Sequence, residues 1–321
     1  MIVRNNVIPY RNEVRLSSGE VLSIDKVKLN LKMKKDCNVM NDLSSVCDLS
    51  GREHNMSDSL ISFVKRCKLT MDLLLCHSVT YDYFSKNGCN QYQHYFVFRT
   101  YEKEMFSFAM NYVDYSGTPH FEKATLEFNP NKVSNPLLLF MIDFILFNAW
   151  SSEVKRYDFA VDIPINRQYA FLNRVNGVNY KYFVSDSVTE YLGQRNNDGH
   201  VKLYDKGAEL KLPIDMTRLE VTCESFSRDI LNSYLSKCYF LGVGTLLDEL
   251  SETDRAILEL LFISGSPSKY LNRMSRKKRD VLGKYLSGVQ SFQVSFGDYY
   301  AVIDSIKRFD FDNGRYVCNA K

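Results

Sequence analysis

The amino-acid sequence predicts an α+β fold, in which a mainly antiparallel sheet with packed helices is followed by a small C-terminal helical segment. Three observations support this class. Several stretches alternate between apolar and polar residues and are joined by short turns, which favours antiparallel pairing. Residues 137–147 are almost wholly apolar, which predicts a helix buried against a sheet. After Cys223 the apolar residues recur at helical spacing.

The first half of the chain contains a predicted strand at 24–31, where Val27, Leu29 and Leu31 alternate with polar residues. A short amphipathic helix is expected after Ser57, which is a suitable N-cap. Three further alternating segments, separated by turn residues, predict a meander of strands. Those segments are residues 94–101, 105–115 and 121–128.

The apolar helix is expected to begin at Pro136, with Asn135 as its cap. The next elements expected are a strand, a helix, and then three more strands that complete the sheet. Their residues are 156–163 for the first strand, about 168–175 for the helix, and 180–184, 200–204 and 217–223 for the last strands.

The pattern of the C-terminal part predicts three short helices. Ser251 and Asp254 resemble a capping box before a helix with Ile257, Leu260 and Leu261 on its apolar side. A second helix is expected from 266–267 and a third from Ser275.

The length and composition fit a globular protein. A chain of 321 residues buries one sizeable core and a small appendage, and its 45% hydrophobic and 25% charged residues are ordinary values. The net charge of +3 does not indicate nucleic-acid binding, so a basic contact surface must be local.

The cysteines indicate neither a disulfide framework nor a zinc site. Eight cysteines form no CxxC pair and have no metal-ligand spacing with the five histidines. The first residues lack the long apolar core of a signal peptide, and the apolar run at 137–147 is too short to cross a bilayer. We therefore expect a cytoplasmic protein with free thiols and no membrane contact.

A tyrosine surrounded by charged residues is the most informative feature of the sequence. His200, Lys202 and Tyr204 are spaced by two and so share a strand face, and Lys206 follows directly. Cations beside a phenol lower its pKa and screen a phosphate, which suits attack on a phosphodiester. The alternative is that Tyr204, one of 21 tyrosines, only packs at a sheet edge, and that the histidine is only a hydrogen-bonding residue.

Four carboxylates interrupt otherwise apolar strands: Glu127, Asp158, Asp162 and Glu220. Such residues are costly to bury unless they are paired or bind a metal. We expect them to line one pocket for Mg²⁺ or Mn²⁺, which prefer oxygen ligands, with Asp158 and Glu220 as the first choices. The alternative is a solvated strand face.

Five blocks in order resemble the rolling-circle replication initiators of Gram-positive plasmids, the Rep-trans family. They run from about residue 24 to about residue 286 and read E-F-N-P-N-K from Glu127, R-Y-D-F-A-V-D from Arg156, Y-L-G-Q-R from Tyr191, K-L-Y-D-K-G-A-E from Lys202 and R-L-E from Arg218. The resemblance implies that Tyr204 is the nicking nucleophile. On this reading, Lys202, Lys206 and Arg195 neutralise the scissile phosphate. Lys202 replaces a frequent arginine, and Asn197 a frequent serine.

The resemblance also implies an activity and partners. A supercoiled, hairpin-exposed origin is nicked, leaving a 5′-phosphotyrosine link and a free 3′-OH. A homodimer and a host replicative helicase as partner are implied as well. Two alternatives stay open: a relaxase of an integrative conjugative element, and a non-catalytic, sequence-specific DNA-binding protein that retains the scaffold. The departures at Lys202 and Asn197 are the best support for the last of these.

A basic cluster near the C-terminus is the expected contact with duplex origin DNA, although such clusters are often merely solvated helix faces. Its members are Arg273, Arg276, Lys277, Lys278 and Arg279. The sequence thus predicts a catalytic nicking domain at 1–238 and a helical origin-binding segment at 239–321.

Overall fold

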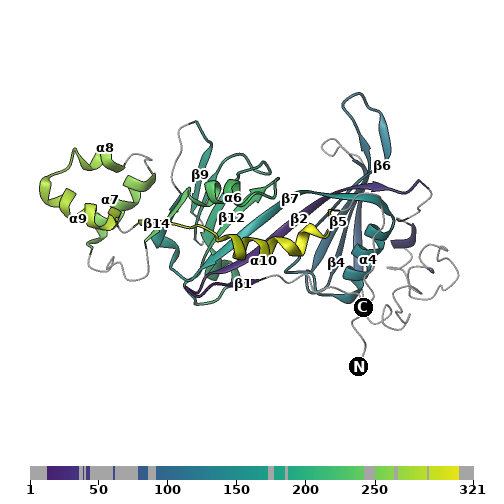
Figure 1. Cartoon of the computed structure of the whole chain (residues 1–321), viewed down its shortest axis with the longest axis horizontal. Helices are drawn as coiled ribbons and strands as arrows, with labels where there is room; N and C mark the ends of the chain where they lie inside the picture. The colour runs from purple at the N-terminus through teal and green to yellow at the C-terminus, as the bar shows by residue number, and fades with distance from the viewer. Residues whose placement is uncertain are drawn as a thin grey trace. The chain divides into compact units, whose positions relative to one another are not determined.

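The structure is a computed structural model, and it confirms the α+β class (Figure 1). The residues that it describes are 13–35, 39, 41–43, 61, 79–85, 92–172, 177–184, 187–241, 250–263, 267–287 and 289–310. The chain forms two compact units. Among the described residues, the first unit holds Ile24–Tyr157 and those from Ile303 onward, and the second holds Glu13–Ser23 and Asp158–Val302. The functional division predicted between residues 238 and 239 remains a prediction.

The first unit contains a sheet with the strand order β3, β4, β5, β6, β2, β7. Each neighbouring pair whose register is described is antiparallel. The strands are Val79–Ser85 (β3), Tyr92–Thr100 (β4), Met105–Val113 (β5), Pro119–Phe128 (β6), Val21–Met33 (β2) and Ala149–Ile163 (β7). The predicted strand at 24–31 and the predicted three-strand meander are confirmed, whereas β3 was not predicted.

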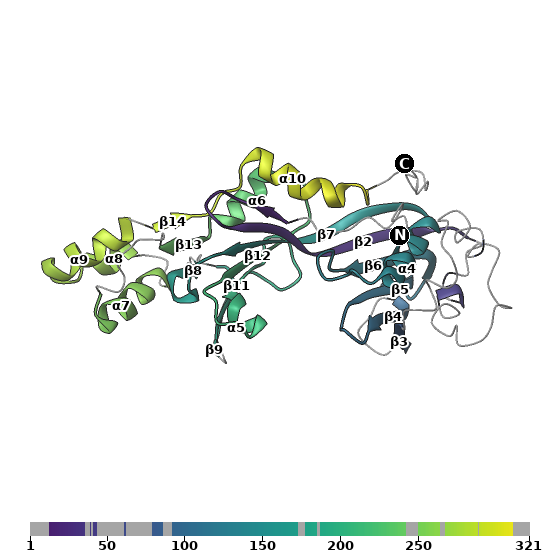
Figure 2. The same ribbon diagram turned by 90° about the horizontal axis from the view of Figure 1, so that it is seen from below.

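The helix α4 (Pro136–Phe147) lies beside β4, β5 and β6 (Figures 1 and 2). It was predicted with its cap: the side chain of Asn135 accepts from the N–H groups of Leu137 (2.9 Å) and Leu138 (3.3 Å). Glu104, between β4 and β5, accepts from the N–H of Ser134 (2.8 Å) and so ties a strand turn to the helix start. The helix is apolar on all sides and almost wholly buried, as expected.

The second unit contains the sheet order β7, β12, β11, β10, β9, and its first strand, β1, pairs with the start of β2. A second sheet has the order β14, β13, β8. The strands are Val14–Arg15 (β1), Ala170–Leu172 (β8), Tyr180–Val184 (β9), Val188–Leu192 (β10), Val201–Asp205 (β11), Thr217–Cys223 (β12), Cys238–Leu241 (β13) and Val289–Ser291 (β14). Strands were predicted at β9, β11 and β12, and all three are confirmed.

The helix predicted near residues 168–175 is wrong for the described residues. Arg167–Tyr169 form a 3₁₀ turn and Ala170–Leu172 form β8, while 173–176 lie outside the described part. The reason is a tertiary contact. The buried Arg167 pairs with Glu190 (2.5 Å), and the N–H of Leu172 donates to the same carboxylate (3.2 Å). Such buried contacts override local helical spacing. The helix predicted after Ser57 also lies outside the described residues, except that Ile61 is helical.

The C-terminal helices are α7 (Glu252–Ile263), α8 (Pro267–Leu271) and α9 (Arg276–Ser287), as predicted. The hydroxyl of Ser251 accepts from the N–H of Asp254 at 3.2 Å, which confirms Ser251 as the N-cap of α7. Leu258, Leu261 and Leu282 pack together with Phe171 of β8. Leu260 is exposed, contrary to expectation. The remaining described helices of note are α5 (Lys206–Leu210), α6 (Arg228–Leu235) and α10 (Phe296–Lys307).

Among the described residues, no helix is both long enough and apolar enough to cross a membrane.

Candidate active site

The strands β11 and β12 bring the predicted tyrosine and its charged neighbours together. In the antiparallel register Tyr204 lies opposite Arg218, and Lys202 lies opposite Glu220. Because residues two apart on a strand share a face, these four side chains project from the same side of the sheet. The sequence spacing had predicted the shared face of Lys202 and Tyr204, and the register adds the two residues of β12.

The phenol of Tyr204 is held by a carboxylate. Its hydroxyl donates to Oε1 of Glu220 at 2.6 Å, and Nζ of Lys202 lies 3.5 Å from Oε2 of the same side chain. Nζ of Lys202 also lies over the Tyr204 ring, 3.8 Å from its centroid, and Nζ of Lys206 lies 5.9 Å from that centroid. Two predicted phosphate-binding lysines therefore flank the predicted nucleophile.

The pKa of Tyr204 is raised from its ordinary value, not lowered as the sequence had suggested. The largest cause is burial of a side chain that is only 5% exposed, followed by the charge of Glu220 and the hydrogen bond to it. Arg218 acts in the opposite direction but with a smaller effect. The raised pKa favours the protonated phenol, so a nucleophilic role requires a base, and Glu220 is the hydrogen-bonded carboxylate next to it.

Three of the four predicted carboxylates share this face of the second unit. On β7, Asp162 makes two hydrogen bonds with the guanidinium of Arg218, at 2.5 and 2.6 Å. The neighbouring Asp158 accepts from the hydroxyl of Thr222 on β12, at 2.8 Å. Because Arg218, Glu220 and Thr222 alternate along β12, they bring Asp158, Asp162 and Glu220 to one side of the sheet.

The fourth predicted carboxylate, Glu127, lies in the first unit. It is ion-paired with Nζ of Lys26 at 2.5 Å and with Nη2 of Arg156 at 3.5 Å. Arg156 is the first residue of the R-Y-D-F-A-V-D block. Its ion pair with Glu127 therefore joins β7 to β6. The role of Glu127 as a metal ligand remains a prediction.

The fit of a divalent metal is partial. Within the described residues, no group of three or more His, Cys, Asp or Glu side chains is arranged to hold an ion. Asp162 is engaged by the arginine, whereas Asp158 accepts from the hydroxyl of Thr222 and Glu220 accepts from the hydroxyl of Tyr204 and also faces Lys202. Mg²⁺ is commonly bound by one or two carboxylates together with substrate phosphates. The donor set therefore fits an ion completed by DNA, not a preformed protein site.

The turn after Tyr204 places Lys206. The side chain of Asp205 caps α5 by accepting from the N–H of Ala208 at 2.8 Å, and Nζ of Lys206 pairs with Glu209. Gly207 is required here, because a Cβ would lie 2.1 Å from the carbonyl oxygen of Ile214. Lys206 is buried, so its side chain is held in one position near the phenol.

Arg195 lies in the exposed turn between β10 and β11. This turn contains Gly193 at φ +91° and Gly199 at φ +72°, both in the left-handed region that favours glycine. His200 stacks on the ring of Tyr191, with ring centroids 5.9 Å apart, which agrees with a packing role for the histidine. Arg195 is exposed, and its predicted role at the phosphate remains a prediction.

The roles of Arg218 and Thr222 were not predicted from the sequence. Arg218 entered only as the first residue of the R-L-E block, yet it is the bidentate partner of Asp162. The signal was present in the spacing of Arg218, Glu220 and Thr222 at intervals of two, which predicts one polar face on an otherwise apolar strand.

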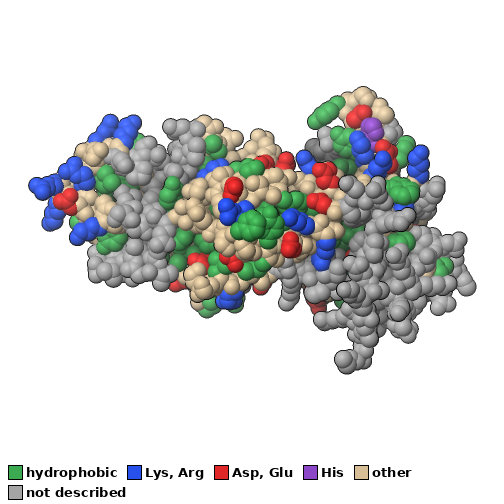
Figure 3. All heavy atoms as spheres, in the orientation of Figure 1, with side chains coloured by type: hydrophobic (Ala, Val, Ile, Leu, Met, Phe, Trp, Pro, Cys, Tyr) green, Lys and Arg blue, Asp and Glu red, His purple; other side chains and the backbone are tan. Residues whose placement is uncertain are grey.

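The predicted basic cluster lies on and just before α9, where Lys and Arg side chains gather at the surface (Figure 3). Arg273, Arg276 and Lys277 are exposed. Lys278 instead pairs with Asp254 of α7, and this hydrogen bond holds the pKa of Asp254 below its usual value. Lys278 therefore also fastens α9 to α7.

A structure of a rolling-circle replication initiator protein from Geobacillus stearothermophilus matches with a TM-score of 0.38 and 12% sequence identity, over 83% of this chain and 97% of that chain. That protein is of the class that the five sequence blocks resemble, but a TM-score this low supports no argument about fold or function. No protein-family model and no curated protein sequence matches the chain.

Proposed function

We propose that the protein is a DNA strand transferase that initiates rolling-circle replication by nicking one strand at an origin. The observation that carries the proposal is the hydrogen bond between Tyr204 and Glu220 (2.6 Å), flanked by Lys202. A nucleophile, a base and a cation thus lie together. The five sequence blocks, three of which meet at this face, support the same function.

The chemistry follows from these positions. Oη of Tyr204 attacks phosphorus while its proton passes to Glu220, and the bond from phosphorus to the 3′ oxygen breaks. The 3′ oxygen leaves and takes a proton from water, which gives a 5′-phosphotyrosine link and a free 3′-OH. Lys202 and Lys206 stabilise the negative charge that develops on the phosphate oxygens. Reversal of the same step rejoins the strand.

A divalent metal belongs to the proposal. Asp158 is the residue that would hold Mg²⁺ or Mn²⁺ while Glu220 acts as the base. Glu220 and Asp162 are the further candidates, and each would first have to leave its present partner, Tyr204 or Arg218. When bound, the ion would polarise the phosphate as a Lewis acid. A homodimer, a supercoiled origin with an exposed hairpin, and a host replicative helicase are proposed on the sequence resemblance alone.

One observation favours a non-catalytic alternative. Tyr204 is only 5% exposed and its hydroxyl is satisfied by Glu220, as expected of a structural tyrosine. On this reading the protein binds origin DNA without cutting it. Nicking requires the phosphate to reach the buried hydroxyl of Tyr204, over whose ring Nζ of Lys202 lies.

Covalent trapping distinguishes the two functions. The protein is incubated with Mn²⁺ and a pool of single-stranded oligonucleotides of random sequence, and in parallel with supercoiled plasmids that carry the DNA flanking its coding sequence. We expect an adduct that survives SDS, and we expect Tyr204→Phe to abolish it because only the hydroxyl is removed.

The control is the neighbouring Tyr191→Phe, which removes a hydroxyl at the start of the Y-L-G-Q-R block and should leave the adduct intact. An adduct that persists in Tyr204→Phe and disappears in Tyr191→Phe would move the nucleophile to Tyr191. A protein that binds the supercoiled plasmids without any adduct would support the non-catalytic function.

A further inference from the structure

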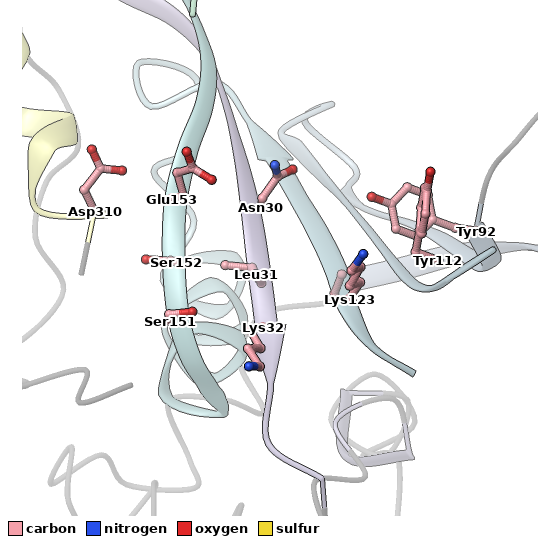
Figure 4. A pocket seen from close by; sticks show the side chains of 11 residues that line it. Asn30, Leu31, Lys32, Tyr92, Tyr112, Lys123, Ser151, Ser152, Glu153 and Asp310 are labelled. Atoms are coloured by element: carbon pink, nitrogen blue, oxygen red, sulfur yellow. The ribbon is translucent and has the colours of Figure 1, made fainter. Parts of the chain in front are cut away.

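A cleft of about 690 Å³ opens on the sheet of the first unit, on a face that the sequence analysis did not single out (Figure 4). Lys32 of β2 and Lys123 of β6 lie in it, directly opposite each other in the antiparallel register. Both side chains are exposed. Like charges opposite each other on neighbouring strands are destabilising, so this pair favours an anionic ligand.

Aromatic side chains lie beside these lysines. Tyr92 and Tyr112 form an edge-to-face pair with centroids 5.5 Å apart, and Nζ of Lys123 lies 5.3 Å from the centroid of Tyr112. In Figure 4 both tyrosines lie on the same side of the cleft as Lys123, whereas Glu153 and Asp310 lie on the opposite side. The carboxylate of Asp310 accepts from the N–H of Val154. One side of the cleft is therefore aromatic and cationic, and the carboxylates lie on the opposite side.

A second cleft, of about 1070 Å³, adjoins the first and shares Lys32 and Ser151 with it. It is lined by Phe121 and Trp150, which are 64% and 51% exposed. Phe121 is two residues from Lys123 on β6 and therefore projects from the same face. Large aromatic side chains left exposed beside lysines mark a binding surface, because burying them elsewhere in the fold would be favourable.

We propose that these two clefts form a binding surface for single-stranded DNA in the first unit. Unpaired bases stack on Phe121 and Trp150, and the backbone phosphates are bound by Lys32 and Lys123. Single strands fit this chemistry better than duplexes, because only unstacked bases present free faces to exposed aromatic rings. The surface lies in a different unit from Tyr204, and binding there needs no bond cleavage, so the inference does not depend on nicking.

The chain provides its own probe, because Trp150 is the only tryptophan. Titration of the full-length protein with an oligothymidylate of about 12 nucleotides, a length within the usual site size, should quench tryptophan fluorescence saturably. Replacing Trp150 with Phe should remove the signal while anisotropy of a labelled oligonucleotide still reports binding. Trp150→Ala should weaken that binding about tenfold through lost stacking.

The salt dependence tests the lysines. The double variant Lys32→Gln, Lys123→Gln should weaken binding and lower the slope of log affinity against log salt by about 1.4, since each contact with a single strand contributes about 0.7. The matched control is Lys103→Gln, Lys181→Gln, which neutralises two exposed lysines outside both clefts and should leave the slope almost unchanged.

Three results would overturn the inference: no quenching by oligothymidylate, an unchanged slope in the double variant, or tighter binding of a duplex of equal length. The same experiments distinguish failure of this inference from failure of the proposed function. Quenching without any covalent adduct supports the surface and contradicts nicking by Tyr204. An adduct without quenching supports nicking and overturns the surface.

Discussion

At the scale of single residues, Glu220 determines what Tyr204 can do. It accepts the phenol hydrogen bond at 2.6 Å and also faces Lys202, so it can take a proton on one oxygen while a cation holds the other. Burial and the same carboxylate raise the pKa of the phenol, which favours its protonated form. On the proposed function, the phenol would therefore lose its proton to Glu220 during the attack and would not be ionised beforehand.

The raised pKa makes a prediction about stability in alkali. In the unfolded chain Tyr204 ionises near pH 10, whereas in the folded chain it stays protonated above that pH. Its contribution to stability is thus present below about pH 10 and is lost as the pH rises further, by about 1.4 kcal/mol per pH unit. Tyr204→Phe lacks this loss. Urea denaturation of both proteins between about pH 9 and pH 11 should show their stability difference changing in favour of the variant.

The other tyrosines are common to both proteins, so their ionisation cancels in the comparison. A stability difference that stays constant across this range would show that Tyr204 ionises as easily in the folded protein as in the unfolded chain.

The carboxylates predict a metal requirement for nicking. EDTA should abolish adduct formation, and Mg²⁺ or Mn²⁺ should restore it. Asp158→Ala should reduce the rate by orders of magnitude, because Lewis-acid action supplies several kcal/mol. The control is Asp114→Ala, which removes a carboxylate in the turn between β5 and β6 that accepts from Ser116 and Thr118. Full activity in chelator would show that Asp158 has a structural role through Thr222.

At the scale of elements, the strand β11 and the helix α5 act together. The N–H groups of Lys206 and Gly207 both donate to the carbonyl of Met216, at 2.8 and 3.3 Å, so the chain folds back tightly after Tyr204. The close approach leaves no room for a side chain at Gly207. The position of Lys206 beside the phenol therefore depends on a backbone contact and not only on the side chain itself.

Gly207→Ala should disturb this turn. Its Cβ would meet the Ile214 carbonyl at 2.1 Å, and because backbone cannot rotate away, we expect a loss of about 1–3 kcal/mol in the free energy of unfolding. The nicking rate should also fall at temperatures where the variant is still folded, because the displaced turn moves Lys206 away from Tyr204. The matched control is Gly283→Ala in α9, where a Cβ meets nothing within 4 Å and alanine should stabilise by about 0.5–1 kcal/mol. Equal thermal denaturation midpoints for the two variants would contradict the argument.

At the scale of the whole molecule, the strands and caps were predictable where the information is local. Asn135, Ser251 and the alternation through β11 and β12 are patterns within a few residues, and the structure confirms them. The pairing of Arg218 with Asp162 was not predictable, because it depends on which strands become neighbours. The same limit explains β8, where the contact of Leu172 with Glu190 replaces the helix that local spacing indicated.

Variants of α9 test the prediction that origin binding resides in residues 239–321 and nicking in residues 1–238. Arg276→Ala, Lys277→Ala and Arg279→Ala together should weaken binding of duplex origin DNA and lower its salt slope by about one for each lost phosphate contact. Lys278 is left in place because its pairing with Asp254 holds α9 against α7. Formation of the adduct with a short single-stranded nick site should change little, because neither the Tyr204 face nor the two clefts of the first unit include residues of α9.

The control is a second triple variant of equal charge, Arg15→Ala, Lys103→Ala and Lys181→Ala, at exposed positions in strands and a turn. Because both variants lose three positive charges, any general electrostatic effect on DNA affinity is the same in each. A drop in duplex affinity confined to the α9 variant would locate origin contact in the helical segment. Equal drops would mean that α9 contributes only net charge, and specificity would then have to be sought elsewhere, beginning with residues 36–56.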